Sequence, residues 1–348
     1  MNEFTIDGQT YSNTRVFIIA EAGVNHNGDL ALAKQLVDIA AKAKADAVKF
    51  QTFKAGSLVT KDAAKATYQQ KNTQNEDSQF SMLKKLELSY EMHKELQDYC
   101  QQEGIIFLST PFDEDSVDLL VDLDLPVFKI GSGDLTNIPM LEYVASKNIP
   151  LIISTGMSYL ADVEEALIAI EGAGNPPVAV LHCVSNYPAD DSDVNLHAML
   201  TMKEAFGIPV GYSDHTPGIP ISLAAVALGA SIIEKHITID RTLPGPDHRA
   251  SLEPDEFAEL VAGIRRIEQS IGTGRKVPSE SEKNTADVAR RSIFAKTDIS
   301  AGTIITKDHI IMKRPSSGLP PKLVPYVLGL KAKHDISADT ALSFEILE

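Results

Sequence analysis

The stretch "PVGYSDHTPGIPISLAAVALGASIIEKHIT", residues 209–238, decides the fold because it contains a strand, a helix and a second strand in succession. Its two ends, 209–214 and 231–238, are short apolar segments of strand character. Between them, "ISLAAVALGA" has apolar residues at helical spacing. A helix that joins two strands in this way is typical of a parallel sheet in an α/β protein.

The same unit recurs along most of the chain. The segments of strand character are "VFIIAEAG" (16–23), "AVKFQT" (47–52), "IIFLSTP" (105–111), "VFKIGS" (127–132), "LIISTG" (151–156), "VAVLHCV" (178–184), "PVGYSD" (209–214) and "SIIEKHIT" (231–238). Eight such strands with helical patterns between them predict a (β/α)8 TIM barrel. A doubly wound open sheet is the alternative, and the count of eight disfavours it.

The flanking segments differ in texture from the barrel units. An Asp-Gly turn signal in "FTIDGQTY" predicts a hairpin within residues 1–14 that could close the bottom of a barrel domain spanning 1–271. The polar, breaker-rich segment 272–287 is expected to be a linker. Short β pieces with Gly and Pro turns predict a small β-rich domain over 288–348. The long polar insertion 54–81 is expected to be a flap or lid beside the site, or else solvated decoration.

Composition narrows the class of protein. A chain of 348 residues, 43% hydrophobic and 23% charged, can bury a large core as soluble enzymes do. The net charge of −16 argues against nucleic acid as a partner. Cys100 and Cys183 are too few for a disulfide framework, which suits a reducing cytoplasm. No segment approaches the ~18 continuous apolar residues of a membrane span, so we expect a cytoplasmic protein without a membrane partner.

Charged residues occupy one face of the predicted strands. Side chains alternate between faces, and the residues opposite the apolar positions of their strands are Glu21, Lys49, Gln51, Lys129, Glu234 and His236. Buried charges are costly unless paired or solvated, so these groups should gather at the open C-terminal mouth of the barrel.

Hydroxyl groups end several of the same strands: Thr110, Ser132, Ser154 and Ser213. For any single serine, capping of the next helix is the plainer explanation. Capping does not explain the two inward lysines, however. Two lysines and a ring of hydroxyls suit a small ligand with phosphate and carboxylate groups, such as phosphoenolpyruvate.

Two histidines are expected to be neighbours at this mouth. His215 follows the seventh strand and His236 lies near the end of the eighth. Two imidazoles leave open positions on a divalent ion for water and a substrate oxygen, as a Lewis-acid site requires. A lone histidine at a strand end is more often structural, but the pair with Glu234 favours a metal site. We interpret His182 as structural, and the sequence leaves the role of His26 open.

Ten runs in the chain resemble the N-acetylneuraminate (sialic acid) synthase family, which includes the bacterial legionaminate synthases. They are "IAEAGVNHNG", "VKFQTF", "STPFDEDS", "KIGSGD", "ISTGM", "HCVSNYP", "GYSDHT", "EKHIT", "GPDHRAS" and "KRPSSG". The likeness covers essentially the whole chain, and its C-terminal part resembles the antifreeze-like (SAF, β-clip) domain of those enzymes.

The resemblance implies a metal-dependent condensation of phosphoenolpyruvate with the open-chain aldehyde of an N-acetylated hexosamine, with uptake of water and release of phosphate. N-acetylmannosamine, giving N-acetylneuraminate, is the expected acceptor. The alternative is a legionaminate synthase that uses 2,4-diacetamido-2,4,6-trideoxymannose. Two departures from the commoner family pattern leave the sugar open: Asp134 stands where many relatives have glutamate, and Ser185 where some have asparagine.

The resemblance also implies roles for individual residues. His215 and His236 would hold manganese, with magnesium or cobalt possible. Catalytic roles fall to Glu21, Glu234 and His236. The positions that match phosphoenolpyruvate contacts are Lys49, Gln51, Thr110, Lys129, Ser132, Ser154 and Ser213. The positions that match sugar contacts are Asp134, Tyr187, Asp247 and Arg314, although Asp247 could be a turn residue and Tyr187 a packing residue.

Arg314 matches an arginine that reaches into the active site of the partner subunit, which implies a domain-swapped homodimer. Two other classes of protein remain as alternatives. An octulosonate or heptulosonate phosphate synthase would need a second cationic clamp, for which Arg241 and Arg249 are the candidates. A non-catalytic carbohydrate-binding protein would have no need of inward lysines and paired histidines.

Overall fold

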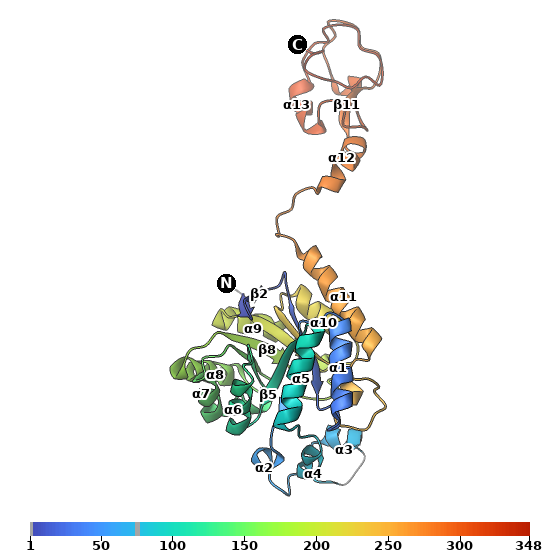
Figure 1. Cartoon of the computed structure of the whole chain (residues 1–348). Helices are drawn as coiled ribbons and strands as arrows, with labels where there is room; N and C mark the ends of the chain where they lie inside the picture. The colour runs from blue at the N-terminus through green and yellow to red at the C-terminus, as the bar shows by residue number, and fades with distance from the viewer. Residues whose placement is uncertain (1–2, 74–76) are drawn as a thin grey trace. The chain divides into compact units, whose positions relative to one another are not determined.

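The computed structural model of the chain describes residues 3–73 and 77–348. These residues form two compact units, 1–272 and 273–348, each described here by itself. Figure 1 colours the chain from one end to the other. Among the described residues, no helix is both long and apolar enough to cross a bilayer.

The first unit is a parallel barrel, which confirms the predicted TIM fold. Its strands are β3 (Phe17–Gly23), β4 (Ala47–Thr52), β5 (Ile106–Pro111), β6 (Phe128–Ile130), β7 (Leu151–Ser154), β8 (Val178–Cys183), β9 (Val210–Asp214) and β10 (Ile232–His236). They pair in the order β5-β4-β3-β10-β9-β8-β7-β6, and β5 also lies against β6. The sheet therefore curves round on itself, and the open-sheet alternative is wrong.

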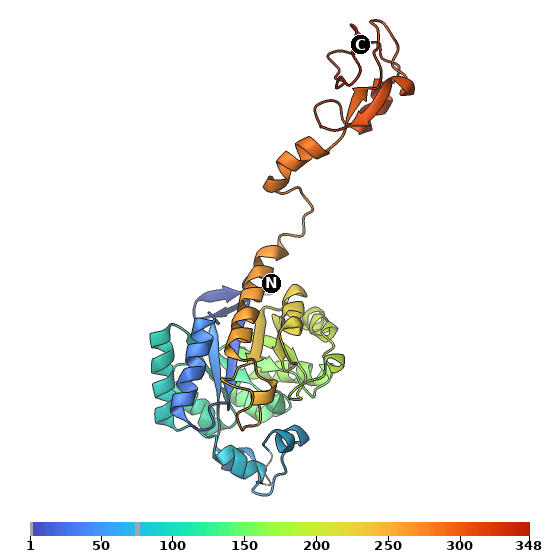
Figure 2. The same cartoon turned by 90° about the vertical axis from the view of Figure 1, so that its right-hand side faces the viewer.

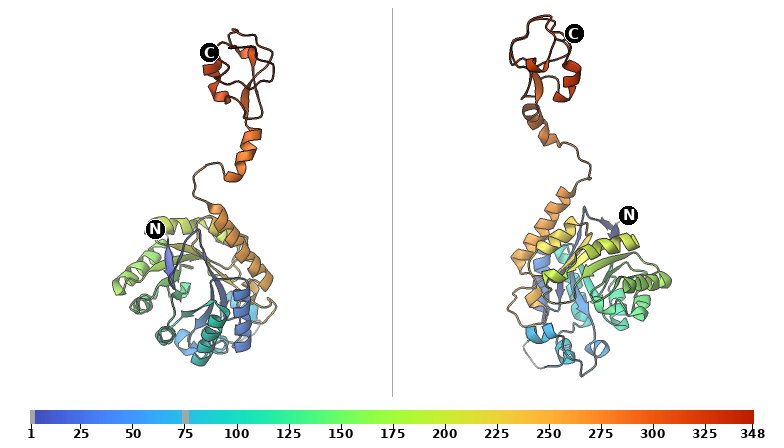
Figure 3. Two further views of the ribbon diagram at one scale, coloured as in Figure 1. Left: turned by 45° about the horizontal axis from the view of Figure 1, so that its top comes forward. Right: turned by 180° about the vertical axis from the view of Figure 1, so that it is seen from behind.

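Helices surround this barrel, as Figure 3 shows. They are α1 (Leu30–Lys42), α5 (Tyr90–Glu103), α6 (Glu114–Asp122), α7 (Ile138–Ala145), α8 (Leu160–Ala173), α9 (His197–Phe206), α10 (Pro220–Ala227) and α11 (Pro254–Ile271). Outward strand residues such as Val48, Phe50 and Ile233 pack against them in one fully buried cluster. Helices cover the outer face of each strand, and side chains of the barrel interior cover the inner face. Strands buried on both faces have nearly continuous apolar sequences.

A second cluster fills the barrel interior and includes an N-terminal hairpin of β1 (Phe4–Ile6) and β2 (Gln9–Tyr11). Asp7 and Gly8 form its turn with φ of 48° and 70°, a conformation that the Asp-Gly pair favours. The side chains of Phe4, Ile6 and Tyr11 join Phe17 and other residues near the N-terminal ends of the barrel strands. Each is at most 2% exposed, and such burial contributes roughly 1.5–3 kcal/mol per side chain.

The insertion between β4 and α5 is structured. It holds α2 (Ala55–Leu58), α3 (Thr67–Thr73) and α4 (Gln79–Lys84). Phe53, Met82 and Leu86 form a small core with Val24 from the loop after β3. Figure 2 shows the insertion and the N-terminal hairpin at opposite ends of the barrel. The insertion therefore lies at the end where the strands terminate.

The second unit has its own small core. It contains α12 (Lys283–Ala289), β11 (Ser292–Ala295), β12 (Ile310–Lys313) and α13 (Val324–Val327). β11 and β12 are antiparallel, and the buried cluster includes Ile293, Val327 and Leu342. The short 3-10 helices of the chain are η1 (Ser132–Asp134), η2 (Asp191–Asp193), η3 (His248–Ala250), η4 (Glu280–Glu282), η5 (Lys307–His309) and η6 (Pro321–Leu323). The segment expected as a linker, 272–287, thus contains η4 and most of α12.

Candidate active site

The C-terminal ends of the barrel strands surround a cavity of about 470 Å³. Most of the predicted site residues line it: Glu21, Lys49, Gln51, Thr110, Lys129, Ser132, Ser154, Tyr187, Ser213, His215, Glu234, His236 and Asp247. Asp134 lies in η1, where its carboxylate accepts a hydrogen bond from Asn137 at 3.1 Å. Arg314 belongs to the second unit and is exposed.

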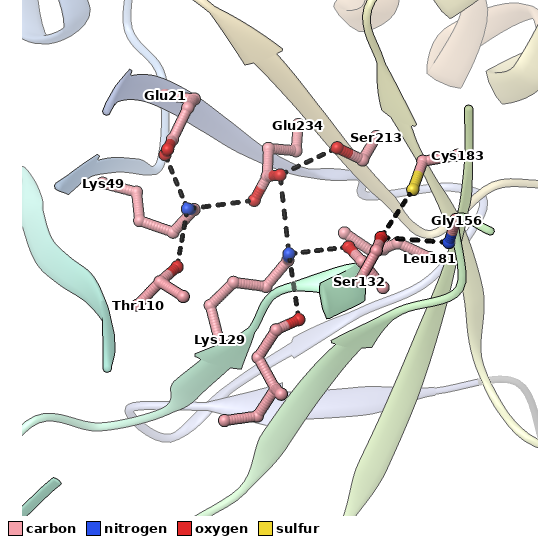
Figure 4. A network of polar contacts seen from close by, with 12 residues as sticks. Glu21, Lys49, Thr110, Lys129, Ser132, Gly156, Leu181, Cys183, Ser213 and Glu234 are labelled. Atoms are coloured by element: carbon pink, nitrogen blue, oxygen red, sulfur yellow. Dashed lines mark hydrogen bonds and ion pairs between the residues drawn. The ribbon is translucent and has the colours of Figure 1, made fainter. Parts of the chain in front are cut away.

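Two lysines and two glutamates form a buried network at the floor of the cavity (Figure 4). The Lys49 Nζ lies 2.7 Å from the Glu21 carboxylate and 3.7 Å from that of Glu234. Lys129 reaches the other oxygen of Glu234 at 3.6 Å. The register of the strands brings these side chains together. Glu21 of β3 pairs with Lys49 of β4 on one side and with His236 of β10 on the other.

Hydroxyl groups complete this network. Lys49 donates to Thr110 at 2.9 Å and Lys129 donates to Ser154 at 2.6 Å. Ser213 donates to Glu234 at 2.8 Å. All of these side chains are almost fully buried, so each ionised group depends on its partners for stabilisation. These residues thus lie together on the inner face of the barrel, as the alternation of side chains along the strands predicts.

The two glutamates differ in their protonation. Burial raises the pKa of Glu21 to about 7, and the nearby charge of Glu234 adds to this effect against the opposing pull of Lys49. Burial acts on Glu234 too, but Lys129 and Lys49 outweigh it and lower its pKa to about 2. Environments that push two carboxyl pKa values apart assign them different roles. Glu234 is a permanent carboxylate, whereas Glu21 can exchange a proton near neutral pH.

Ser132 is held at the rim by its neighbours. Its Oγ accepts from the backbone N–H of Gly156 at 3.0 Å and contacts the Cys183 Sγ at 3.1 Å. A Cβ on Gly156 would lie 2.2 Å from the Ser185 Oγ. A side chain at this position would therefore displace the Ser185 and Ser132 hydroxyls, so glycine keeps both where they are.

His215 and His236 are neighbours, with ring centroids 5.5 Å apart. The Nδ1 of His215 donates to the Val184 carbonyl at 2.6 Å, because that oxygen can only accept. Its Nε2 therefore keeps a lone pair, and it contacts the Ser213 Oγ at 3.5 Å, whose proton goes to Glu234. The Nδ1 of His236 is buried without a hydrogen-bond partner in the described part of the chain. Burial lowers the pKa of His215 to about 4 and that of His236 well below its ordinary value. Both rings are therefore neutral at physiological pH.

Neutral imidazoles with unpaired nitrogens are the donors that a divalent cation requires. Residues 3–73 and 77–348 contain no group of three or more His, Cys, Asp or Glu side chains placed to hold a metal. A cation bound here would thus have His215 and His236 as its protein ligands and would keep several open positions. The two histidines fit a substrate-binding metal of the kind expected from the sequence.

Aromatic and acidic residues form the wall above the histidines. Tyr187 packs on His215 with centroids 4.1 Å apart and meets His236 edge-on at 5.5 Å. Tyr68, from α3, also packs against Tyr187, with ring centroids 5.0 Å apart. Burial raises the pKa of Asp247, which lies beside them in the same cavity, to about 7. Tyr68 was not among the predicted site residues. The only sign in the sequence that the insertion could reach the site was its length.

The remaining charged and histidine residues near the strand ends have other environments. Lys235 points away from the cavity, pairs with Asp214 at 2.9 Å and is fully buried with it. His182 donates to the Val194 carbonyl at 2.6 Å, in agreement with a structural role. His26 accepts from the Gly28 backbone N–H at 2.9 Å. It is fully buried near Phe50, with ring centroids 6.1 Å apart, and does not line the cavity.

A TIM barrel with buried lysines, carboxylates of split pKa and a histidine pair at its strand ends is the architecture of an enzyme that acts on a small anionic substrate. The chain belongs to the NeuB family, whose model matches residues 36–276, and a SAF domain model matches residues 290–348.

Known proteins are similar over nearly the whole chain. The N,N'-diacetyllegionaminic acid synthase of Campylobacter jejuni is 49% identical over 93% of this chain and 98% of its own length. Human N-acetylneuraminate-9-phosphate synthase is 38% identical over 95% of this chain and 92% of its own. The crystal structure of N-acetylneuraminic acid synthetase from Leptospira borgpetersenii, in complex with citrate, superposes with a TM-score of 0.72 at 38% identity and covers 81% of this chain and 94% of that one.

Proposed function

We propose that the chain is a nonulosonic acid synthase. It condenses phosphoenolpyruvate with the open-chain aldehyde of an N-acylated hexosamine and water, and it releases phosphate. Its relatives are synthases of legionaminic, pseudaminic and sialic acids. The observation that carries the proposal is the buried network of Lys49, Lys129, Glu21 and Glu234 at the strand ends of a barrel of this family.

The lysines and hydroxyls are placed to bind the anion. The Lys129 ammonium with the Ser154 hydroxyl, and the Lys49 ammonium with that of Thr110, offer charge-assisted and neutral donors to phosphate and carboxylate oxygens. We also assign Gln51, Ser132 and Ser213 to this ligand because they line the same cavity. Binding in a buried site fixes the orientation of the enol carbon toward the mouth, where the aldehyde enters.

The carboxylates act on the reacting carbons. The enol carbon of phosphoenolpyruvate forms the new bond to the aldehyde carbon, and positive charge develops at the carbon that bears the phosphate ester. Glu234, ionised at all working pH values, stabilises that charge until water adds and the C–O bond to phosphate breaks. Glu21 is the proton-exchanging group, with a pKa of about 7.

His215 and His236 would hold the divalent cation, with manganese expected and magnesium or cobalt as alternatives. When bound, such a cation supplies a Lewis acid for the aldehyde oxygen. The acceptor itself would contact Tyr187 and Asp247 in the wall above, and Asp134 at the entrance. N-acetylmannosamine and 2,4-diacetamido-2,4,6-trideoxymannose are the two acceptors that we propose.

The alternative of a phosphorylated acceptor receives no support from the cavity. Among the described residues that line it, Lys49 and Lys129 are the only cations, and both face carboxylates. Arg241 is paired with Glu256, and Arg249 is exposed; neither lines the cavity. The barrel itself therefore offers no bidentate partner to a phosphate at the far end of the acceptor.

The test is an assay of metal-free protein with phosphoenolpyruvate, with and without manganese, against each of the two acceptors. Phosphate and keto-acid product are measured together. We expect both to appear in equal amounts and only with metal, and the acceptor with the higher kcat/KM identifies the product. Release of phosphate without keto-acid product, or no reaction with either acceptor, would overturn the proposal.

We further propose a cytoplasmic homodimer in which Arg314 completes the active site of the partner subunit. Buried free thiols at Cys100 and Cys183 suit a reducing compartment. Mixing Arg314→Ala protein with Lys129→Met protein tests the exchange. Activity should return in the mixed dimer, because one site then combines an intact barrel with an intact arginine. If the mixture stays inactive although subunits exchange, the arginine does not act across the dimer.

A further inference from the structure

The insertion between β4 and α5, residues 53–73 and 77–88, supplies one wall of the cavity. Its side chains along the cavity are mostly apolar and include Leu58, Val59, Met82, Leu83 and Leu86. No lysine of its described residues lines the cavity. The floor is therefore charged and hydrophilic, whereas the wall provided by the insertion is apolar and uncharged.

A series of ring contacts, each tilted by 34–38°, connects this wall to the histidine pair. The ring of Tyr68 lies 5.0 Å from that of Tyr187, which lies 4.1 Å from that of His215. The insertion is also tied to the loop that bears Asp247, since the Asn72 side chain donates to the Pro246 carbonyl at 2.6 Å. Tyr68, Tyr187 and Asp247 thus enclose one corner of the cavity above the histidines.

This corner has the composition of a sugar-binding subsite. Aromatic rings present large apolar faces with a polar tip, and small-ligand sites combine such faces with a few polar groups that fix orientation. Tyr68 is half-buried and lines the cavity directly, so its ring is available to a ligand rather than enclosed in the protein core. The anion has its donors on the floor, which leaves the corner for the second substrate.

We propose that the insertion is the acceptor-binding wall and that Tyr68 is its specificity-determining residue, which holds the apolar face of an uncharged N-acylated sugar beside Tyr187. This inference rests on the proposed function. It gives the insertion a task that neither its length nor its composition reveals. The carbon chain and acetyl methyl groups of the acceptor pack on the ring, while its hydroxyls reach Asp247.

The test compares three variants of the full-length enzyme in steady-state kinetics with both substrates varied. Tyr68→Leu removes the ring and should raise KM for the acceptor about tenfold, the effect of losing one aromatic contact, with KM for phosphoenolpyruvate unchanged. Tyr68→Phe retains the ring and should stay within about threefold of wild type. Tyr90→Leu changes an exposed tyrosine outside the cavity and should match wild type.

A second readout uses the absence of tryptophan from the chain. Tyr68→Trp creates a single tryptophan, which can be excited selectively over the remaining tyrosines and whose emission should change when acceptor is added to enzyme holding phosphoenolpyruvate and manganese. The change should be half-maximal at an acceptor concentration close to the acceptor KM and should saturate well above it. The same addition should leave the emission of a Tyr90→Trp variant unaltered.

The outcomes separate the inference from the proposed function. If wild-type enzyme condenses neither acceptor, the proposed function fails. If wild type is active but Tyr68→Leu keeps its acceptor KM within twofold, or raises both KM values equally, the inference alone is wrong. Circular dichroism shows whether Tyr68→Leu folds. If it does not fold, the other two variants decide. A Tyr68→Phe acceptor KM raised more than about threefold, or a Tyr68→Trp emission that does not respond to acceptor, refutes the inference.

Discussion

Replacement of Asp247 by asparagine should remove a pH-dependent loss of stability. The carboxyl is 7% exposed, and burial raises its pKa to about 7 from an ordinary value of 3.8. Between these two pH values the folded protein keeps the proton and the unfolded chain has lost it. The unfolded state then binds fewer protons than the folded state, so stability falls as pH rises through this window.

The magnitude follows from the distance between the two pKa values. Each pH unit corresponds to about 1.4 kcal/mol, so a gap of about three units costs the folded state about 4 kcal/mol once the pH exceeds 7. Asparagine has nearly the same shape and carries no charge. Asp247→Asn should therefore match wild type near pH 4 and exceed its unfolding free energy by about 4 kcal/mol at pH 8.

Urea unfolding of both proteins in metal-free buffer at several pH values measures this difference. All other titrating groups are common to the two proteins and cancel in the comparison. Asp98→Asn, on the exposed face of α5, is the matched control, and its effect should stay within about 0.5 kcal/mol at every pH. A difference between Asp247→Asn and wild type that does not change from pH 4 to pH 8 would refute the reasoning.

Three further substitutions test other parts of the barrel. Lys235→Met should lower the unfolding free energy by about 3–5 kcal/mol in urea titrations, because it leaves the fully buried Asp214 carboxylate without its cation; a loss below about 1 kcal/mol would contradict this. Gly156→Ala should raise KM for phosphoenolpyruvate by displacing Ser132, and an unchanged KM would show that the rim adapts. Lys129→Met should raise that KM at least about tenfold and leave acceptor KM unaltered; equal effects on both would mean general damage to the site.

The barrel was predictable because its strands are buried on both faces. Helices cover one side of each strand and interior side chains cover the other, so the strands appear in the sequence as apolar runs interrupted by turns. The predicted segments agree with β3 to β10 to within two residues at either end. Alternation then located the charged floor, since Glu21, Lys49 and Glu234 break the apolar pattern on a single face.

The wall of the cavity was not predictable in the same way. Tyr68 and Tyr187 are far apart in sequence, and no periodicity connects an insertion to a loop across the barrel mouth. The insertion was expected as a flap or as decoration, and its helices α3 and α4 lack the regular apolar spacing that signals a helix. Lys235 shows a second limit of prediction from the sequence. Alternation along β10 places its side chain on the outer face, away from that of Glu234, but does not identify Asp214 as its partner.

Closure of the barrel by β3 and β10 has a consequence for the order of events during synthesis. β3 ends at Gly23, whereas its partner β10 begins at Ile232, and the N-terminal hairpin shares its core with that same residue. At translation rates of about 5–20 residues per second, the intervening chain takes roughly 10–40 s to make. Through that interval β3 can pair with β4 on one side while its other edge stays open, and an unpaired strand edge invites association with other chains. The edge of β3 that faces β10 thus stays unpaired until residues 232–236 have been made, and covering that edge until then limits association between nascent chains.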